Sequence, residues 1–202
     1  MARISAIDKQ TTRERLLAAA ARHFAEFGWA GALVDRISVE AGYAKGTLYN
    51  YFATKEELFA AVIEAAARRA AERYRDRPRG GTLRDRLLAL ARADVDVLRE
   101  DEDFTKVLVR EAMSFRPETY PLIVEHLSSY LVAIAEELGE AAANGELRND
   151  LPPPRLALIF VGLLSLLYVQ HWGSAGAWPT LDEIPALVVT LFLDGTAARE
   201  AS

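Results

Sequence analysis

The sequence predicts an all-α protein, and three observations support that fold class. Of the 202 residues, 51% are apolar, and Ala and Leu dominate. Apolar side chains recur at three- and four-residue spacing, as in Leu17, Ala20, Phe24 and Phe27, which places them on one helix face. Runs typical of strands are few, and breakers such as Pro78–Gly81 separate the helical segments, about nine in all.

The composition excludes several kinds of site. The chain has no cysteine, so it has no disulfide or thiolate metal site, and we expect no metal and no cofactor. Residues 1–15 are charged and lack the apolar segment of a signal peptide. The longest apolar run, Leu156–Val169, has 14 residues, which is fewer than the ~20 that a membrane-spanning helix needs. We therefore expect a cytoplasmic protein with no membrane partner.

The charge is unevenly distributed along the chain. The net charge is −5, yet residues 1–55 hold eight Lys or Arg and five Asp or Glu, which leaves a net charge of −8 on the remainder. A basic end on an acidic chain favours a contact with phosphate at that end. An excess of this size also arises by chance and is weak support on its own.

The stretch ISVEAGYAKGTLYNYF has the pattern of a helix-turn-helix. Val34–Ala41 predicts one short helix, Gly42 suits a sharp turn, and Ala44–Phe52 predicts a second short helix. Leu48 and Phe52 lie four residues apart and are expected to be buried together, while the opposite face is polar and small. Such a pair of helices reads the major groove of DNA, and an ordinary helical hairpin is the alternative.

Residues 12–63 resemble the N-terminal domain of the TetR family of bacterial transcriptional repressors. The similarity is gapless and includes GTLYNYF at Gly46–Phe52 and KEEL at Lys55–Leu58. Two helix caps usual in the family are missing, because Ala32-Leu33 and Ala44 stand where Thr or Ser is typical. Each missing cap costs about 1 kcal/mol of local helix stability, but the side chains that face DNA remain.

The resemblance implies two domains with different functions. Residues 1–54 would form the DNA-binding domain, with its motif at about 33–52, and residues 55–202 a helical domain for ligand sensing and dimerisation. The partners implied are a palindromic operator in double-stranded DNA, a small-molecule effector and a second copy of the chain.

The predicted DNA contacts combine base reading with phosphate binding. Asn50 can pair with an adenine edge, and Lys45 can reach a guanine or a phosphate. Gly46 lets the backbone approach the duplex, and the remaining hydroxyls and cations suit phosphates. Arg36 is a weaker candidate because it can instead pair with Glu40, four residues on. The full set is Arg36, Lys45, Gly46, Thr47, Tyr49, Asn50, Tyr51 and Lys55.

Five helices are expected after Pro78–Gly81, and the last two resemble a dimer interface. They are Thr82–Glu100, Glu102–Ser114, Glu118–Asn144, Arg155–Trp172 and Asp182–Ala198. Arg155–Trp172 is apolar nearly all round, so it needs cover on more than one side, from a partner subunit or from a self-contained core. The expected interface residues are Leu158, Gly162, Leu163, Ser165, Leu187, Val188, Leu191 and Phe192.

The same helices carry large and polar side chains that suit a ligand pocket. Pockets are mostly apolar with a few convergent polar groups, so we expect an apolar or aromatic effector. A packed aromatic core has the same composition and stays an open alternative. The candidates are Phe104, Arg110, Met113, Phe115, Tyr120, His126, Tyr130, Tyr168 and Trp172.

The sequence therefore predicts a ligand-responsive, homodimeric repressor and not an enzyme. No spacing typical of a catalytic or metal motif links the histidines to acidic side chains. A helical enzyme and an adaptor that kept the fold without binding DNA are the alternatives.

Overall fold

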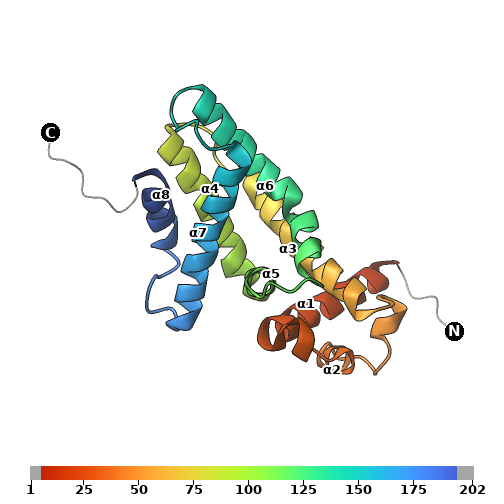
Figure 1. Ribbon diagram of the computed structural model, residues 1–202. Helices are drawn as coiled ribbons and strands as arrows, with labels where there is room; N and C mark the ends of the chain where they lie inside the picture. The colour runs from red at the N-terminus through yellow and green to blue at the C-terminus, as the bar shows by residue number, and fades with distance from the viewer. Residues whose placement is uncertain (1–5, 195–202) are drawn as a thin grey trace. The chain divides into compact units, whose positions relative to one another are not determined.

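The computed structural model describes residues 6–194. Within that range the chain forms eight α-helices, one single-turn 3₁₀ helix and no strand, which confirms the all-α fold class (Figure 1). Residues 195–198 of the last expected helix lie outside the described range. The elements in chain order are α1 (Ala6–Gly31), α2 (Val34–Glu40), η1 (Leu48–Asn50), α3 (Lys55–Arg75), α4 (Leu83–Glu100), α5 (Glu102–Met113), α6 (Tyr120–Ala143), α7 (Pro153–Gly173) and α8 (Ile184–Asp194).

The described residues form two compact units. The first holds residues up to 68 together with 101–126, and the second holds 69–100 together with the residues from 127 onward. Helix α5 thus belongs to the same unit as the helix-turn-helix. The functional boundary expected at residue 54 coincides with the start of α3 and stays a prediction.

The first unit is built on α1, which packs against α2 and α5. Its core consists of apolar side chains from these helices, η1 and the start of α3. Leu48 and Phe52 are buried, as predicted, while Lys45 and Asn50 are exposed. The principal core residues are Leu16, Phe24, Ile37, Leu48, Phe52, Leu58, Phe59 and Ile63.

Helix α1 contains a break at Gly28. This residue has φ 67° and ψ 177°, a conformation that an L-residue rarely adopts. A Cβ here would also lie 3.1 Å from Nε of Arg110. After this break the chain forms one more short helical turn, Trp29–Gly31, before α2 begins.

The second helix of the motif differs from the prediction. In place of one α-helix over Ala44–Phe52, the chain makes turns and the 3₁₀ helix η1, with backbone bonds such as Tyr49 N–H to the Gly46 carbonyl, 3.1 Å. Gly46 has φ 86°, which an α-helix does not accommodate. The prediction of a continuous helix was wrong because this glycine interrupts it.

The second unit centres on α4, α7 and α8, with α8 packed against both of the others. Its core includes Leu87, Leu90, Ile134, Phe160 and Leu164. Helix α7 has 21 residues and is, among the described helices, long and apolar enough to cross a bilayer by length and composition alone. The helix is longer than its uninterrupted apolar run Leu156–Val169, because it begins at Pro153 and ends at Gly173. Core helices of soluble proteins pass the same test.

Candidate nucleic-acid interface

The segment from Lys45 to Tyr51 presents polar groups on the surface of the first unit. Lys45, Tyr49 and Asn50 are exposed, and Gly46, Thr47 and Tyr51 are half-buried. Leu48 anchors the segment, since its side chain is completely buried. An ammonium, an amide and phenolic hydroxyls on one short exposed segment can serve both base edges and phosphates.

The turn before this segment is fixed by backbone conformation and one buried hydroxyl. Gly42 has φ 84°, so the left-handed turn expected there is confirmed. The Ser38 hydroxyl is fully buried and donates to the Ala44 carbonyl at 2.7 Å. This hydrogen bond connects the end of α2 to the start of the DNA-facing segment, although neither Leu33 nor Thr47 provides a side-chain helix cap.

Arg36 is exposed, and its alternative partner is engaged elsewhere. Glu40 accepts from Nε of Arg22 at 3.0 Å and lies 3.4 Å from Nδ1 of His23. These contacts connect α1 to α2 and leave the Arg36 guanidinium available for a partner outside the chain. Among the described residues, no ion pair joins Arg36 to Glu40.

The two lysines predicted to contact DNA lie in different surroundings. The Lys45 side chain is 71% exposed, and its ammonium lies 3.7 Å from an Asp35 carboxylate oxygen. The Lys55 ammonium instead donates to the Ala32 carbonyl at 2.7 Å and lies 4.9 Å from the Trp29 ring centroid. Burial lowers the pKa of Lys55, and attraction to Glu56 and Glu111 opposes that effect.

A groove of about 750 Å³ runs beside these residues. Its lining joins α2 to the DNA-facing segment and includes apolar side chains that the sequence analysis did not single out. Leu33 and Val39 are exposed there beside Tyr49. Leu33 precedes α2 and Val39 lies within it. Because α2 directly precedes the polar segment in the sequence, this proximity could have indicated that they share its surface. The lining consists of Ala32, Leu33, Val34, Asp35, Arg36, Val39, Lys45, Tyr49 and Lys55.

Family comparisons match both parts of the chain. The model of bacterial regulatory proteins of the tetR family matches residues 16–62, and that of the tetracyclin repressor-like C-terminal domain matches residues 80–196. The chain belongs to the TetR family. This TetR-family chain is a DNA-binding transcriptional regulator and not an enzyme.

Two curated relatives agree with this assignment, and a solved structure shares the fold. The HTH-type transcriptional repressor AcnR of Corynebacterium diphtheriae is 32% identical over 92% of this chain and 93% of its own. The HTH-type transcriptional repressor SCO4008 of Streptomyces coelicolor is 30% identical over 79% and 80%. The fold is similar to that of the fatty acid degradation regulator FadR from Bacillus halodurans, with a TM-score of 0.79 and 23% identity over 93% and 97% of the two chains.

The predicted effector-binding residues of this TetR-family regulator fall into three settings. Met113, Phe115 and Tyr120 are exposed, Phe115 by 80% and at a positive φ of 53°. Arg110 is exposed as well, and it donates to the carbonyls of Ala25 and Glu26 at 2.9 and 3.0 Å. His126 and Trp172 are half-buried, and Phe104, Tyr130 and Tyr168 are buried.

The structure brings two of these candidates together on a carboxylate that the sequence analysis missed. Asp94 of α4 accepts from the Tyr130 hydroxyl at 2.5 Å and from the Tyr168 hydroxyl at 2.6 Å. Burial raises the pKa of Asp94, while the two phenol donors act in the opposite direction. The three residues come from α4, α6 and α7, so they connect three helices of the second unit. No sequence spacing signals this contact, because 36 and 74 residues separate the partners.

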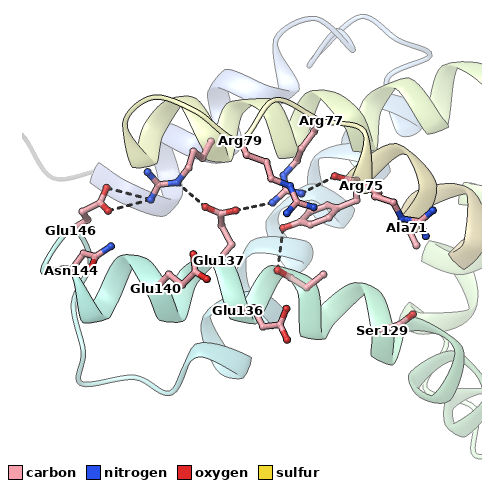
Figure 2. Close-up of a pocket in the computed structure, with 13 residues that line it drawn as sticks. Ala71, Arg75, Arg77, Arg79, Ser129, Glu136, Glu137, Glu140, Asn144 and Glu146 are labelled. Atoms are coloured by element: carbon pink, nitrogen blue, oxygen red, sulfur yellow. Dashed lines mark hydrogen bonds and ion pairs between the residues drawn. The ribbon is translucent and has the colours of Figure 1, made fainter.

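A polar groove of about 600 Å³ lies elsewhere in the second unit, between the end of α3 and α6 (Figure 2). Glu137 accepts from the guanidinium groups of Arg77 and Arg86, each at 2.7 Å. The Arg77 guanidinium lies 3.6 Å from the Tyr74 ring centroid and is buried. Glu146 adds a further partner for Arg86. The charged side chains are thus arranged as a bridge between helices.

The predicted dimer residues divide between a core and an exposed face. Val188 is fully buried within its own unit, and Phe192 packs edge-on against Phe160 with ring centroids 5.2 Å apart. Leu158 and Gly162 are exposed, and the remaining residues of the set, Leu163, Ser165, Leu187 and Leu191, are half-buried. Ile159, Leu166 and Val169 are exposed as well, although the prediction omitted them. Residues 158, 162, 166 and 169 are spaced three or four apart, so they share one helix face, and this spacing could have identified the exposed apolar face from the sequence.

Proposed function

We propose that this regulator is a homodimeric repressor that binds a palindromic operator and leaves it when a small effector binds. Its relatives in Corynebacterium diphtheriae and Streptomyces coelicolor carry the name repressor. One observation carries the DNA-binding part: the exposed polar groups of Lys45, Tyr49 and Asn50 lie directly around the buried anchor Leu48.

The DNA contacts divide into two kinds. Asn50 reads an adenine, because its amide can both donate to and accept from the base edge. Arg36, Lys45 and the hydroxyls of Thr47, Tyr49 and Tyr51 bind phosphates or flanking bases. The backbone at position 46 has a left-handed φ of 86°, which favours glycine over other residues there. A Cβ there would meet no atom of the chain within 4 Å, so a larger side chain would extend outward.

The second copy covers the exposed apolar face of α7. Leu158, Ile159, Leu166 and Val169 are between 41% and 58% exposed, and they line one side of this helix. Together with the half-buried Leu187 and Leu191 of α8, they form a two-helix face that a twofold axis can pair with itself. If a partner subunit covers this face, the apolar length of α7 is explained by protein packing and not by a membrane. This agrees with a cytoplasmic location for the regulator.

The effector binds among the helices of the second unit. The buried rings of Tyr130 and Tyr168 and the half-buried indole of Trp172 provide apolar surface, and the polar groups beside them are the two phenol hydroxyls and the Asp94 carboxylate that accepts from both. We therefore assign it an apolar or aromatic effector.

Binding assays with Asn50→Ala test the central assignment. The probes are a duplex selected by the wild-type protein from a random library and a duplex of unrelated sequence. Loss of a bidentate base contact costs about 1–3 kcal/mol of discrimination. We expect Asn50→Ala to relax the preference at one base pair in each half-site and to leave the salt dependence unchanged.

Lys45→Ala is the matched comparison. Its loss should weaken binding to both duplexes and lower the salt slope by about one unit for each subunit. If Asn50→Ala weakens both duplexes equally, Asn50 does not read a base. If the wild-type protein selects no duplex, the proposed function is wrong.

A further inference from the structure

The Lys55 ammonium is engaged inside the first unit. It donates to the Ala32 carbonyl at 2.7 Å, and the Trp29 ring lies 4.9 Å away. Lys55 is half-buried, whereas the Lys45 side chain is 71% exposed. A cation over an indole face and against a carbonyl is held in one geometry from within the protein.

Trp29 is itself held from several sides. Its backbone N–H donates to Oε1 of Glu111 at 2.9 Å, and Glu111 is 1% exposed. The indole packs against Phe59 with ring centroids 5.0 Å apart and stacks on Phe24 at 6.1 Å. Thr119 donates to the second Glu111 oxygen at 3.3 Å. The indole face beside the Lys55 ammonium is therefore held by packing and by hydrogen bonds.

The Ala32 carbonyl lies at the point where the motif begins. Ala32 is buried, and its N–H donates to the Gly28 carbonyl at 3.1 Å. Leu33 follows as the N-cap of α2 and makes no side-chain capping hydrogen bond. With no cap to orient the start of α2, the bond from Lys55 is the side-chain contact that fixes the peptide just before it.

We propose that Lys55 is a positioning residue that fixes the start of α2 through Ala32 and Trp29, and that its ammonium does not bind a DNA phosphate. This inference rests on the proposed DNA-binding function and assigns one of its residues a different role. Lys55 influences DNA recognition indirectly. It places α2, and the Ser38 hydroxyl of α2 in turn holds the start of the DNA-facing segment through the Ala44 carbonyl. Glu111 of α5 supports the same placement through the Trp29 N–H.

Salt-dependent DNA binding distinguishes positioning from phosphate contact. A lysine on a phosphate releases counterions when it binds, so its loss lowers the salt slope, whereas a positioning lysine leaves the slope unchanged. We compare Lys55→Met with Lys45→Met on the duplex selected by the wild-type protein. Methionine keeps most of the aliphatic stem and removes the charge.

Lys55→Met should lower affinity about tenfold at every salt concentration, as expected for loss of one hydrogen bond to a charged group, with the wild-type slope retained. Lys45→Met should lower the slope by about one unit for each subunit. A comparable fall in slope for Lys55→Met would overturn the inference and leave the proposed function intact. A wild-type protein that binds no duplex would overturn both.

One further measurement decides the matter if Lys55→Met does not fold, because it uses the wild-type protein. Reductive methylation should show DNA protecting Lys45 and leaving the reactivity of Lys55 unchanged. Protection of Lys55 by DNA would overturn the inference.

Discussion

At the scale of single residues, Asp94 lies in an uncommon environment for a carboxylate. Its carboxylate is held by two phenols, and no ion pair to it is found among the described residues. Burial raises its pKa, so the folded state binds the Asp94 proton more tightly than the unfolded state does. The contribution of this group to the free energy of unfolding is therefore complete at acid pH. It is lost as the pH rises through the folded-state pKa.

Asp94→Asn should remove that dependence. The difference in free energy of unfolding between wild type and Asp94→Asn should decrease as the pH rises above about 4, because an ordinary carboxyl titrates near 3.9 and burial raises the pKa of this one. Urea unfolding at each pH measures it. Asp96→Asn is the control, since Asp96 lies on the same helix but is exposed and paired with Arg99. A difference that rises with pH would show that Asp94 is not destabilised by its burial.

At the scale of elements, the sequence was most informative where the signal was local. Two such features depend only on neighbouring residues and were predictable: the start of α5 at Glu102, and the capping hydrogen bond that the Glu57 N–H donates to the Thr54 hydroxyl oxygen, 3.1 Å. The interruption at Gly46 was missed because a glycine within a helical pattern can equally be helical. The contacts of Lys55 and Asp94 involve residues 23 to 74 positions away, so they could not be predicted from spacing along the chain.

The bridge at Glu137 joins α6 to Arg77 in the bend after α3 and to Arg86 in α4. Glu137→Gln would leave the buried Arg77 guanidinium without its charged partner. Breaking a buried ion pair in this way costs about 3–5 kcal/mol. Thermal or urea unfolding should show a loss of that order. Glu140→Gln, one turn further along α6 and exposed, should change stability by less than about 0.5 kcal/mol. Equal effects of the two variants would show that Glu137 contributes no more than a surface carboxylate.

At the scale of the whole molecule, the exposed face of α7 predicts the assembly. The double variant Leu158→Asp, Leu166→Asp places charges on a face that is 58% and 51% exposed within one chain, so the fold itself tolerates them. We expect monomers in light scattering and loss of operator binding, because one half-site alone provides half of the contacts. Val132→Asp is the control, since Val132 is 54% exposed on α6. A double variant that remains dimeric would show that this face is not the interface.

The apolar face of α7 has a consequence for the amount of protein present. When two chains share part of their core, mass action makes stability depend on their concentration. Diluting the regulator should lower its melting temperature, and the Leu158→Asp, Leu166→Asp variant should melt at one temperature at every dilution. A regulator present in a few copies would then be lost to unfolding and proteolysis sooner than an abundant one. Its cellular level would set both operator occupancy and its own lifetime.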